Sequence, residues 1–109
     1  MSPVPSTWIE VPGAADLKEG FVKTFLVDGF PLALARAEGR VYAVEDRCSH
    51  DDGPLGEGRM EGCEVICPRH GARFDVRDGR ATRMPAVQGI LSVPVKEEAG
   101  KVYVDGGAL

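Results

Sequence analysis

All three cysteines and both histidines of this chain lie within residues 48–70, which read CSHDDGPLGEGRMEGCEVICPRH. The stretch begins with Cys48-Ser49-His50 and ends with Cys67-Pro68-Arg69-His70, and sixteen residues separate His50 from Cys67. Each motif offers one thiolate and one imidazole from a single tight turn. Both groups are strong ligands for transition metals. The sequence therefore predicts two facing loops that hold either one metal ion or two.

The chemistry of the donor set leaves two kinds of centre open. Zinc takes two cysteines and two histidines tetrahedrally, but zinc fingers usually pair Cys with Cys and His with His, which fits the mixed motifs poorly. Two sulfide-bridged irons also need four outer ligands. If both thiolates bind one iron and both imidazoles the other, an added electron localises on the histidine-bound iron, and the reduction potential rises. Colour separates the two centres, because zinc is colourless.

The segments on either side of this stretch predict an all-β domain of short strands punctuated by glycine and proline. Asp28-Gly29 is a strong hairpin signal between Phe21–Val27 and Phe30–Ala35. Glu38-Gly39 then leads into Val41–Val44, so we expect an antiparallel meander of three strands.

Weaker signals complete the expected set of elements. Ala99-Gly100 predicts a second hairpin, and Ala14–Glu19 predicts about one helical turn. The remaining strand candidates are Trp8–Val11, Val65–Ile66, Phe74–Val76, Leu91–Val95 and Val102–Val104.

Length and composition narrow the class of protein. A chain of 109 residues with 43% hydrophobic residues predicts a single globular domain, residues 1–109. The net charge of −4 argues against nucleic-acid binding, and no apolar run reaches the length of a membrane-spanning helix. The first residues lack a secretory signal, so we expect a cytoplasmic protein. Three cysteines are an odd number, which favours metal binding over a disulfide framework.

The two motifs and their spacing are the signature of the Rieske family, and the chain resembles the small soluble ferredoxins that serve bacterial oxygenases. The resemblance covers roughly residues 8–105. Beyond the motifs it extends to Asp51–Leu55, Gly71–Asp75, Met84–Ala86, Pro94-Val95 and Lys101–Val104. It implies a Rieske fold, with antiparallel β-sheets in a sandwich-like base and a small cluster-binding subdomain at approximately residues 46–86.

The resemblance also implies one [2Fe–2S] cluster per chain and its ligands. Cys48 and Cys67 would bind the buried iron, and His50 and His70 the outer iron. Respiratory Rieske proteins place a serine and a tyrosine where this chain has Ala72 and Phe74, and they carry an additional cysteine in each loop. A cluster without these hydroxyl donors is expected to have a reduction potential at the low end of the Rieske range.

The function implied is one-electron transfer from a flavin reductase to a terminal oxygenase or similar redox enzyme, without catalysis by this chain. Once four ligands are assigned, no histidine remains for the 2-His-1-carboxylate iron site of an oxygenase. Two alternatives stay open, a small Rieske subunit of a nitrite-reductase-type complex and a cluster-bearing regulatory or assembly protein. No nucleic acid or membrane partner is expected.

Two further features of the sequence are Cys63 and the uneven distribution of charge. Cys63 is expected to be a buried packing thiol, because cysteine is frequent in cores. Acidic residues dominate positions 45–64 and arginines dominate positions 69–83. These charges are either a solvated face or a docking surface near the histidines.

Overall fold

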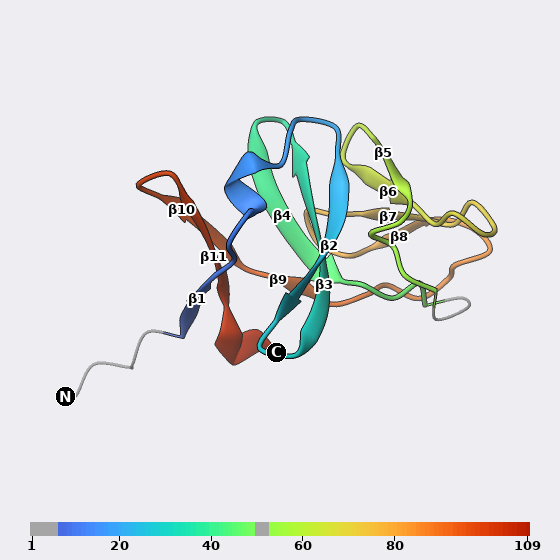
Figure 1. Ribbon diagram of the computed structural model, residues 1–109. Helices are drawn as coiled ribbons and strands as arrows, with labels where there is room; N and C mark the ends of the chain where they lie inside the picture. Colours follow the sequence, from blue (N-terminus) through green and yellow to red (C-terminus); the bar gives the residue numbers. More distant parts are fainter. Residues whose placement is uncertain (1–6, 50–52) are drawn as a thin grey trace.

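The computed structural model describes residues 7–49 and 53–109, which form three antiparallel sheets (Figure 1). The first sheet has the order β1 (Trp8–Glu10), β11 (Lys101–Asp105) and β10 (Val95–Glu98). The second has the order β2 (Val22–Val27), β3 (Phe30–Ala37), β4 (Arg40–Glu45) and β9 (Ser92–Val93). The third follows chain order through β5 (Arg59–Glu61), β6 (Glu64–Ile66), β7 (Arg73–Asp75) and β8 (Ala81–Arg83). The expected all-β class is confirmed.

The β2–β3–β4 meander is the frame on which the other parts are built. Val27 pairs with Phe30 around Asp28 and Gly29, which adopt φ of 53° and 83°. Two consecutive left-handed residues match the twist of a two-residue hairpin, and a glycine meets the second at little cost. Glu38-Gly39 turns the chain in the same way, with φ of 54° and 77°. Both predicted turns are confirmed.

Strand β3 is buried on both of its faces. Leu32 and Leu34 pack with side chains of the first sheet in one apolar cluster, while Ala33 and Ala35 pack in another cluster that contains Phe74 of β7. Because successive strand residues point to opposite faces, one strand serves both clusters. A fully buried leucine contributes about 1.5–3 kcal/mol through the hydrophobic effect. The first two sheets thus form the expected sandwich-like base.

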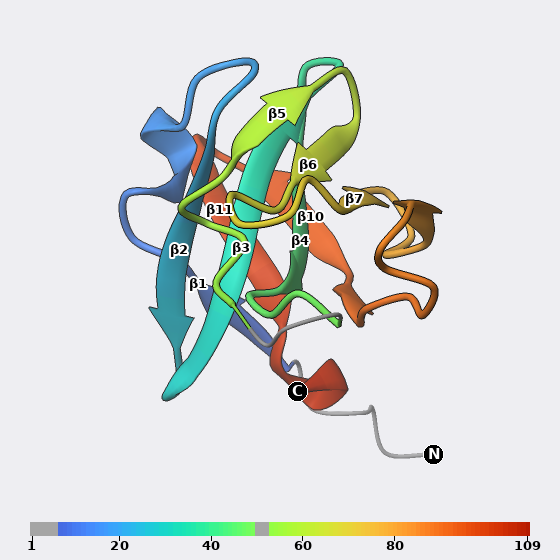
Figure 2. The same cartoon turned by 90° about the vertical axis from the view of Figure 1, so that its right-hand side faces the viewer.

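The third sheet covers the remaining face of the meander. Seen from its own side, β5 and β6 lie across β3 and β4 (Figure 2), in agreement with the shared cluster of buried side chains. Val65 and Phe74 are cross-strand partners on this sheet and are both inaccessible to solvent. This layer carries the loops that contain the cysteine motifs.

Some expectations need correction. Leu91–Val95 is not one strand, because Pro94 separates β9, which pairs with β4, from β10, which pairs with β11. Proline lacks the amide hydrogen that a continuous ladder requires, so the chain changes sheets there. The expected helical turn is confined to a 3₁₀ segment, Ala14–Asp16, and a second, η2, lies at Gly106–Ala108. Strands β5 and β8 were not predicted from the sequence. In residues 7–49 and 53–109, no helix has the length and apolar character to span a membrane.

Asp75 is a buried carboxylate that fastens the end of β7. Its two oxygens accept from Nε and NH2 of Arg77 at 3.0 and 2.7 Å, and its backbone carbonyl accepts from the amide of Gly79 at 2.7 Å. The Arg77 guanidinium lowers the pKa of Asp75 below its usual value, against the opposing effect of burial. At Gly79, φ is 82° and a side chain would collide with the carbonyl of Ile90. The turn after β7 is therefore tightly specified.

We predict that Asp75→Asn lowers the free energy of unfolding by about 2 kcal/mol at pH 7, the size of a charge-assisted hydrogen bond. Because the folded-state pKa of Asp75 lies below the usual 3.8, its stabilisation is complete above that pH and is lost as the pH falls through the folded value. Urea titrations should therefore show a difference between the variants that persists at pH 7 and shrinks below about pH 4.

The matched control is Asp78→Asn, since the Asp78 side chain is exposed. Among the described residues it accepts one hydrogen bond, from the backbone amide of Arg80 at 2.9 Å. Equal losses of stability in the two variants would contradict the assignment.

Candidate metal centre

The first motif lies in the loop that leaves β4. The amide of Cys48 donates to the carbonyl of Gly53 at 2.8 Å, and the amide of Gly58 donates to the carbonyl of Leu55 at 2.9 Å. Leu55 is fully buried and packs in the same cluster as Cys48. The predicted ligand His50 and its neighbours Asp51 and Asp52 lie outside the described residues.

The second motif forms the loop between β6 and β7. The amide of Cys67 donates to the carbonyl of Ala72 at 2.8 Å, and its own carbonyl accepts from the amide of Gly71 at 3.1 Å. Gly71 has a φ of 73°, in the left-handed region that glycine adopts readily. His70 precedes it at the exposed tip of the loop. The loop thus holds Cys67 in the buried layer through these hydrogen bonds and leaves His70 exposed.

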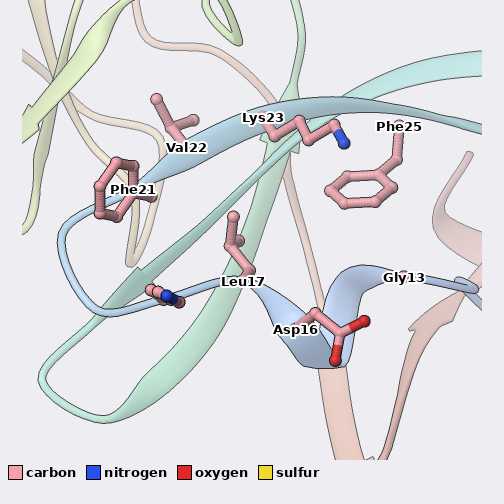
Figure 3. Close-up of a pocket in the computed structure, with 8 residues that line it drawn as sticks. Gly13, Asp16, Leu17, Phe21, Val22, Lys23 and Phe25 are labelled. Atoms are coloured by element: carbon pink, nitrogen blue, oxygen red, sulfur yellow. The ribbon is translucent and has the colours of Figure 1, made fainter.

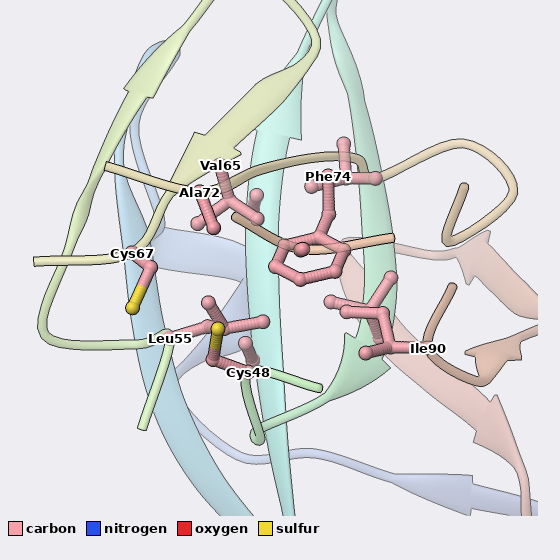
Figure 4. Packing of buried hydrophobic residues seen from close by; sticks show 12 residues of the cluster. Cys48, Leu55, Val65, Cys67, Ala72, Phe74 and Ile90 are labelled. Carbon is pink, nitrogen blue, oxygen red and sulfur yellow. The ribbon is translucent and has the colours of Figure 1, made fainter. Parts of the chain in front are cut away.

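The two motif cysteines meet in one apolar layer. Cys48 is 0% and Cys67 is 1% exposed, and both belong to the cluster that includes Leu55 and Phe74. Their thiols extend from separate loops towards a common region (Figure 4). Two thiolates in such surroundings would be unfavourable without a cation to neutralise them. The donor set therefore fits a metal centre with sulfur ligands on its buried side.

A third segment, Met84–Leu91, packs against the first loop. The hydroxyl of Ser49 donates to the carbonyl of Gln88 at 2.5 Å, and a carboxylate oxygen of Glu45 accepts from the amide of Leu91 at 2.8 Å. Ala86 and Ile90 are buried in the cysteine cluster. The roles of Ser49 and Glu45 were not predicted, because their partners lie 39 and 46 residues further along the chain and no local pattern connects them.

Elsewhere in the described part of the chain, the structure shows no equivalent centre. Among residues 7–49 and 53–109, which exclude His50, no three side chains of His, Cys, Asp or Glu gather tightly enough to hold one ion. A cavity of about 450 Å³ lies between the 3₁₀ segment η1 (Ala14–Asp16) and β2 (Figure 3). It is lined largely by Leu17, Phe21, Val22 and Phe25, with lysines at its rim, and contains no thiol or imidazole.

Cys63 does not lie in the apolar core, and the expectation of a buried packing thiol is wrong. It is partly buried in the β5–β6 turn, beside a polar cavity of about 510 Å³ also lined by Glu38 and Arg77. Burial raises the pKa of the Cys63 thiol, and a hydrogen bond to Glu38 raises it further. Arg77 lies 3.9 Å from a carboxylate oxygen of Glu38. Cys63 therefore belongs to a polar contact between the base and the third sheet.

Comparison with known sequences gives a consistent assignment. Residues 7–96 match the family model described as the Rieske [2Fe–2S] domain. The ferredoxin component of the naphthalene 1,2-dioxygenase system of Pseudomonas putida is 41% identical over 98 residues, covering 90% of this chain and 94% of that protein. The ferredoxin component of the p-cumate 2,3-dioxygenase system of the same species is 40% identical over 95 residues, covering 85% and 80%.

Solved structures agree with the sequence relatives. The ferredoxin of carbazole 1,9a-dioxygenase from Nocardioides aromaticivorans superposes with a TM-score of 0.85 at 34% identity, covering 91% of this chain and 97% of that one. A ferredoxin-sized chain in a complex of reduced oxygenase and oxidised ferredoxin of carbazole 1,9a-dioxygenase also gives a TM-score of 0.85, at 33% identity, covering 93% and 94%.

We predict that Cys63 reacts more slowly with iodoacetamide at pH 7 than a cysteine in an unstructured peptide. Only the thiolate is nucleophilic, and the raised pKa of Cys63 keeps the thiolate scarce at that pH. The rate should rise as the pH passes the usual value of 9.0, measured by mass spectrometry of the Cys63 peptide. Glu38→Gln should accelerate the reaction at pH 7, because it removes the negative charge. A peptide-like rate in the unaltered protein would contradict the prediction.

Proposed function

Because the chain belongs to the Rieske [2Fe–2S] domain family, we propose that it is a one-electron carrier whose single cluster is held by the two Cys-His motifs. The proposed ligands are Cys48, His50, Cys67 and His70. The observation that carries this proposal is the placement of the two thiols. They are buried side chains of separate loops, and they share one apolar cluster.

The division between buried sulfur and exposed nitrogen supports the assignment of the ligands. Cys48 and Cys67 are inaccessible, whereas His70 is exposed three residues after Cys67. Two thiolates on the inner iron and two imidazoles on the outer iron would reproduce this difference. The approximate subdomain 46–86 of the single domain 1–109 contains both motif loops and the whole third sheet. It also includes the start of the Met84–Leu91 segment.

The [2Fe–2S] cluster supplies a reversible one-electron couple when bound. The chain's own residues determine where that electron can leave. The Cys48 and Cys67 loops bury both sulfurs in an apolar cluster, so we expect a partner protein to approach the centre from the side of the exposed His70. The exposed imidazole of His70 provides a short path from that side to a partner protein. No bond of a substrate is made or broken.

The family relatives favour a carrier over a catalyst. They are ferredoxin components of dioxygenase systems, and the solved carbazole dioxygenase complex pairs such a ferredoxin with a separate oxygenase. We therefore propose a terminal oxygenase as electron acceptor and a flavin reductase as donor. The cytoplasm is the proposed location, in line with these partners. No relative described above is a nitrite reductase subunit or a regulatory protein, so the observations do not favour either alternative.

A pair of cysteine variants tests the cluster and the carrier function together. Cys67→Ser should abolish the red-brown absorption and electron transfer from a flavin reductase to a dioxygenase's oxygenase component, because it removes a thiolate ligand. Cys63→Ser is the matched control, four residues away, and should retain both properties. The measurements are iron and sulfide content, the visible spectrum, and oxygenase turnover with a substoichiometric amount of this protein. Unaltered absorption in Cys67→Ser would refute the ligand assignment, and failure of the unaltered protein to support turnover would refute the carrier role.

The reduction potential should fall in the lower part of the range of about −150 to +300 mV for Rieske centres. Ala72 and Phe74 are fully buried beside the cysteines and have no hydroxyl to donate to the cluster sulfurs. Such a bond favours the reduced, more negative state, so its absence lowers the potential. Redox titration followed by visible absorption provides the test. A midpoint above about +100 mV would contradict this account.

A further inference from the structure

Asp46 lies between the end of β4 and the first motif, where its carboxylate joins two separate segments. One oxygen accepts from the hydroxyl of Thr24 in β2 at 2.8 Å, and the other accepts from the amide of Gly56 at 2.6 Å. The backbone amide of Asp46 donates to the carbonyl of Pro31 in β3 at 3.3 Å. This residue thus fastens the far end of the first loop to the rigid meander.

The contact between the loop and β2 leaves no room for a side chain at position 56. A Cβ at Gly56 would collide with the side chain and backbone of Thr24. Leu55 precedes Gly56 and is fully buried beside Cys48. A displacement of Gly56 would therefore move Leu55 and disturb the packing around the cysteine.

The polar side chains next to Asp46 bind a different segment of the chain. Glu45 binds the amide of Leu91, and Ser49 binds the carbonyl of Gln88, so both hold the Met84–Leu91 segment. Asp46 instead closes the loop that contains Cys48 and connects it to the sheet beneath. Loss of Asp46 would leave the third segment attached while releasing the loop itself.

We propose that Asp46 is a positioning residue, which acts through Gly56 and Thr24 to hold the first ligand loop in the geometry that retains the cluster. This inference rests on the proposed function. Residues that orient metal ligands without touching the metal commonly change metal affinity by 10- to 100-fold when replaced. Asp46 fits that description, because it precedes Cys48 by two residues and holds the loop through the amide of Gly56.

Four variants separate positioning from general stability and from charge. Asp46→Ala removes both bonds, and Thr24→Val removes one. Asp46→Asn removes the charge but can still accept from Gly56 and donate to the Thr24 hydroxyl. The matched control is Asp105→Ala, because Asp105 is also partly buried and accepts from the hydroxyl of Thr7 and the amide of Gly107, but lies in the first sheet.

The measurements are the rate of cluster loss to an iron chelator, followed by visible absorption, and the EPR spectrum of the reduced protein. Urea denaturation supplies the overall stability of each variant. We expect Asp46→Ala to lose its cluster about tenfold faster than the unaltered protein and to have a broadened EPR signal. Thr24→Val should show a smaller change in the same direction. Asp46→Asn should have the same rate of cluster loss and the same EPR spectrum as the unaltered protein. Asp105→Ala should also keep both, although its loss of stability should be comparable to that of Asp46→Ala.

Three results would overturn the inference. Asp46→Ala and Asp105→Ala could lose their clusters at equal rates, which would mean that Asp46 acts only through overall stability. Asp46→Asn could match Asp46→Ala, which would assign the effect to charge. The EPR spectrum of Asp46→Ala could remain unaltered. If the unaltered protein binds no cluster at all, the proposed function fails instead, so the two failures are distinguishable.

Discussion

The burial of two thiols from separate loops in one apolar layer is the constraint on which the rest of the structure depends. Cys48 and Cys67 are 19 positions apart, and each occupies the start of its loop. To bring them together, the chain must place the third sheet against the meander, because the first loop leaves β4 and the second joins β6 to β7. The apolar cluster of Leu55, Val65 and Phe74 supplies the packing that holds these layers in contact.

The features readable from the sequence are those set by local chemistry. The turns at Asp28-Gly29 and Glu38-Gly39 require left-handed conformations, and the sequence provides residues that tolerate them. The metal-binding character of the two motifs follows from ligand types and spacing. In contrast, β5 and β8 are three-residue strands whose side chains are mostly exposed, so they carry no apolar alternation for periodicity to detect. The break at Pro94 had a visible signal, since proline interrupts a strand ladder, but the apolar run around it concealed the change of sheet.

The long-range polar contacts of the site could not be predicted from the sequence. Asp46 forms hydrogen bonds with Thr24 and Gly56, which are 22 and 10 residues away in the sequence. Ser49 forms one with Gln88, which is 39 residues away. Cys63 was misplaced for the same reason, because its environment is set by Glu38 and Arg77 on distant turns. Such contacts depend on the packing of finished sheets, and a single sequence contains no signal that pairs them.

The double burial of β3 has a consequence for how this chain tolerates change in length. Leu32 and Leu34 pack in the cluster shared with the first sheet, whereas Ala33 and Ala35 pack in the cluster that contains the cysteines, so large and small side chains alternate between two cores. Insertion or deletion of a single residue there would exchange the two faces, forcing leucines into positions packed for alanine and leaving voids where the leucines had been. Homologous chains should therefore accommodate indels in the turns at either end of this strand, and only paired, compensating changes within it.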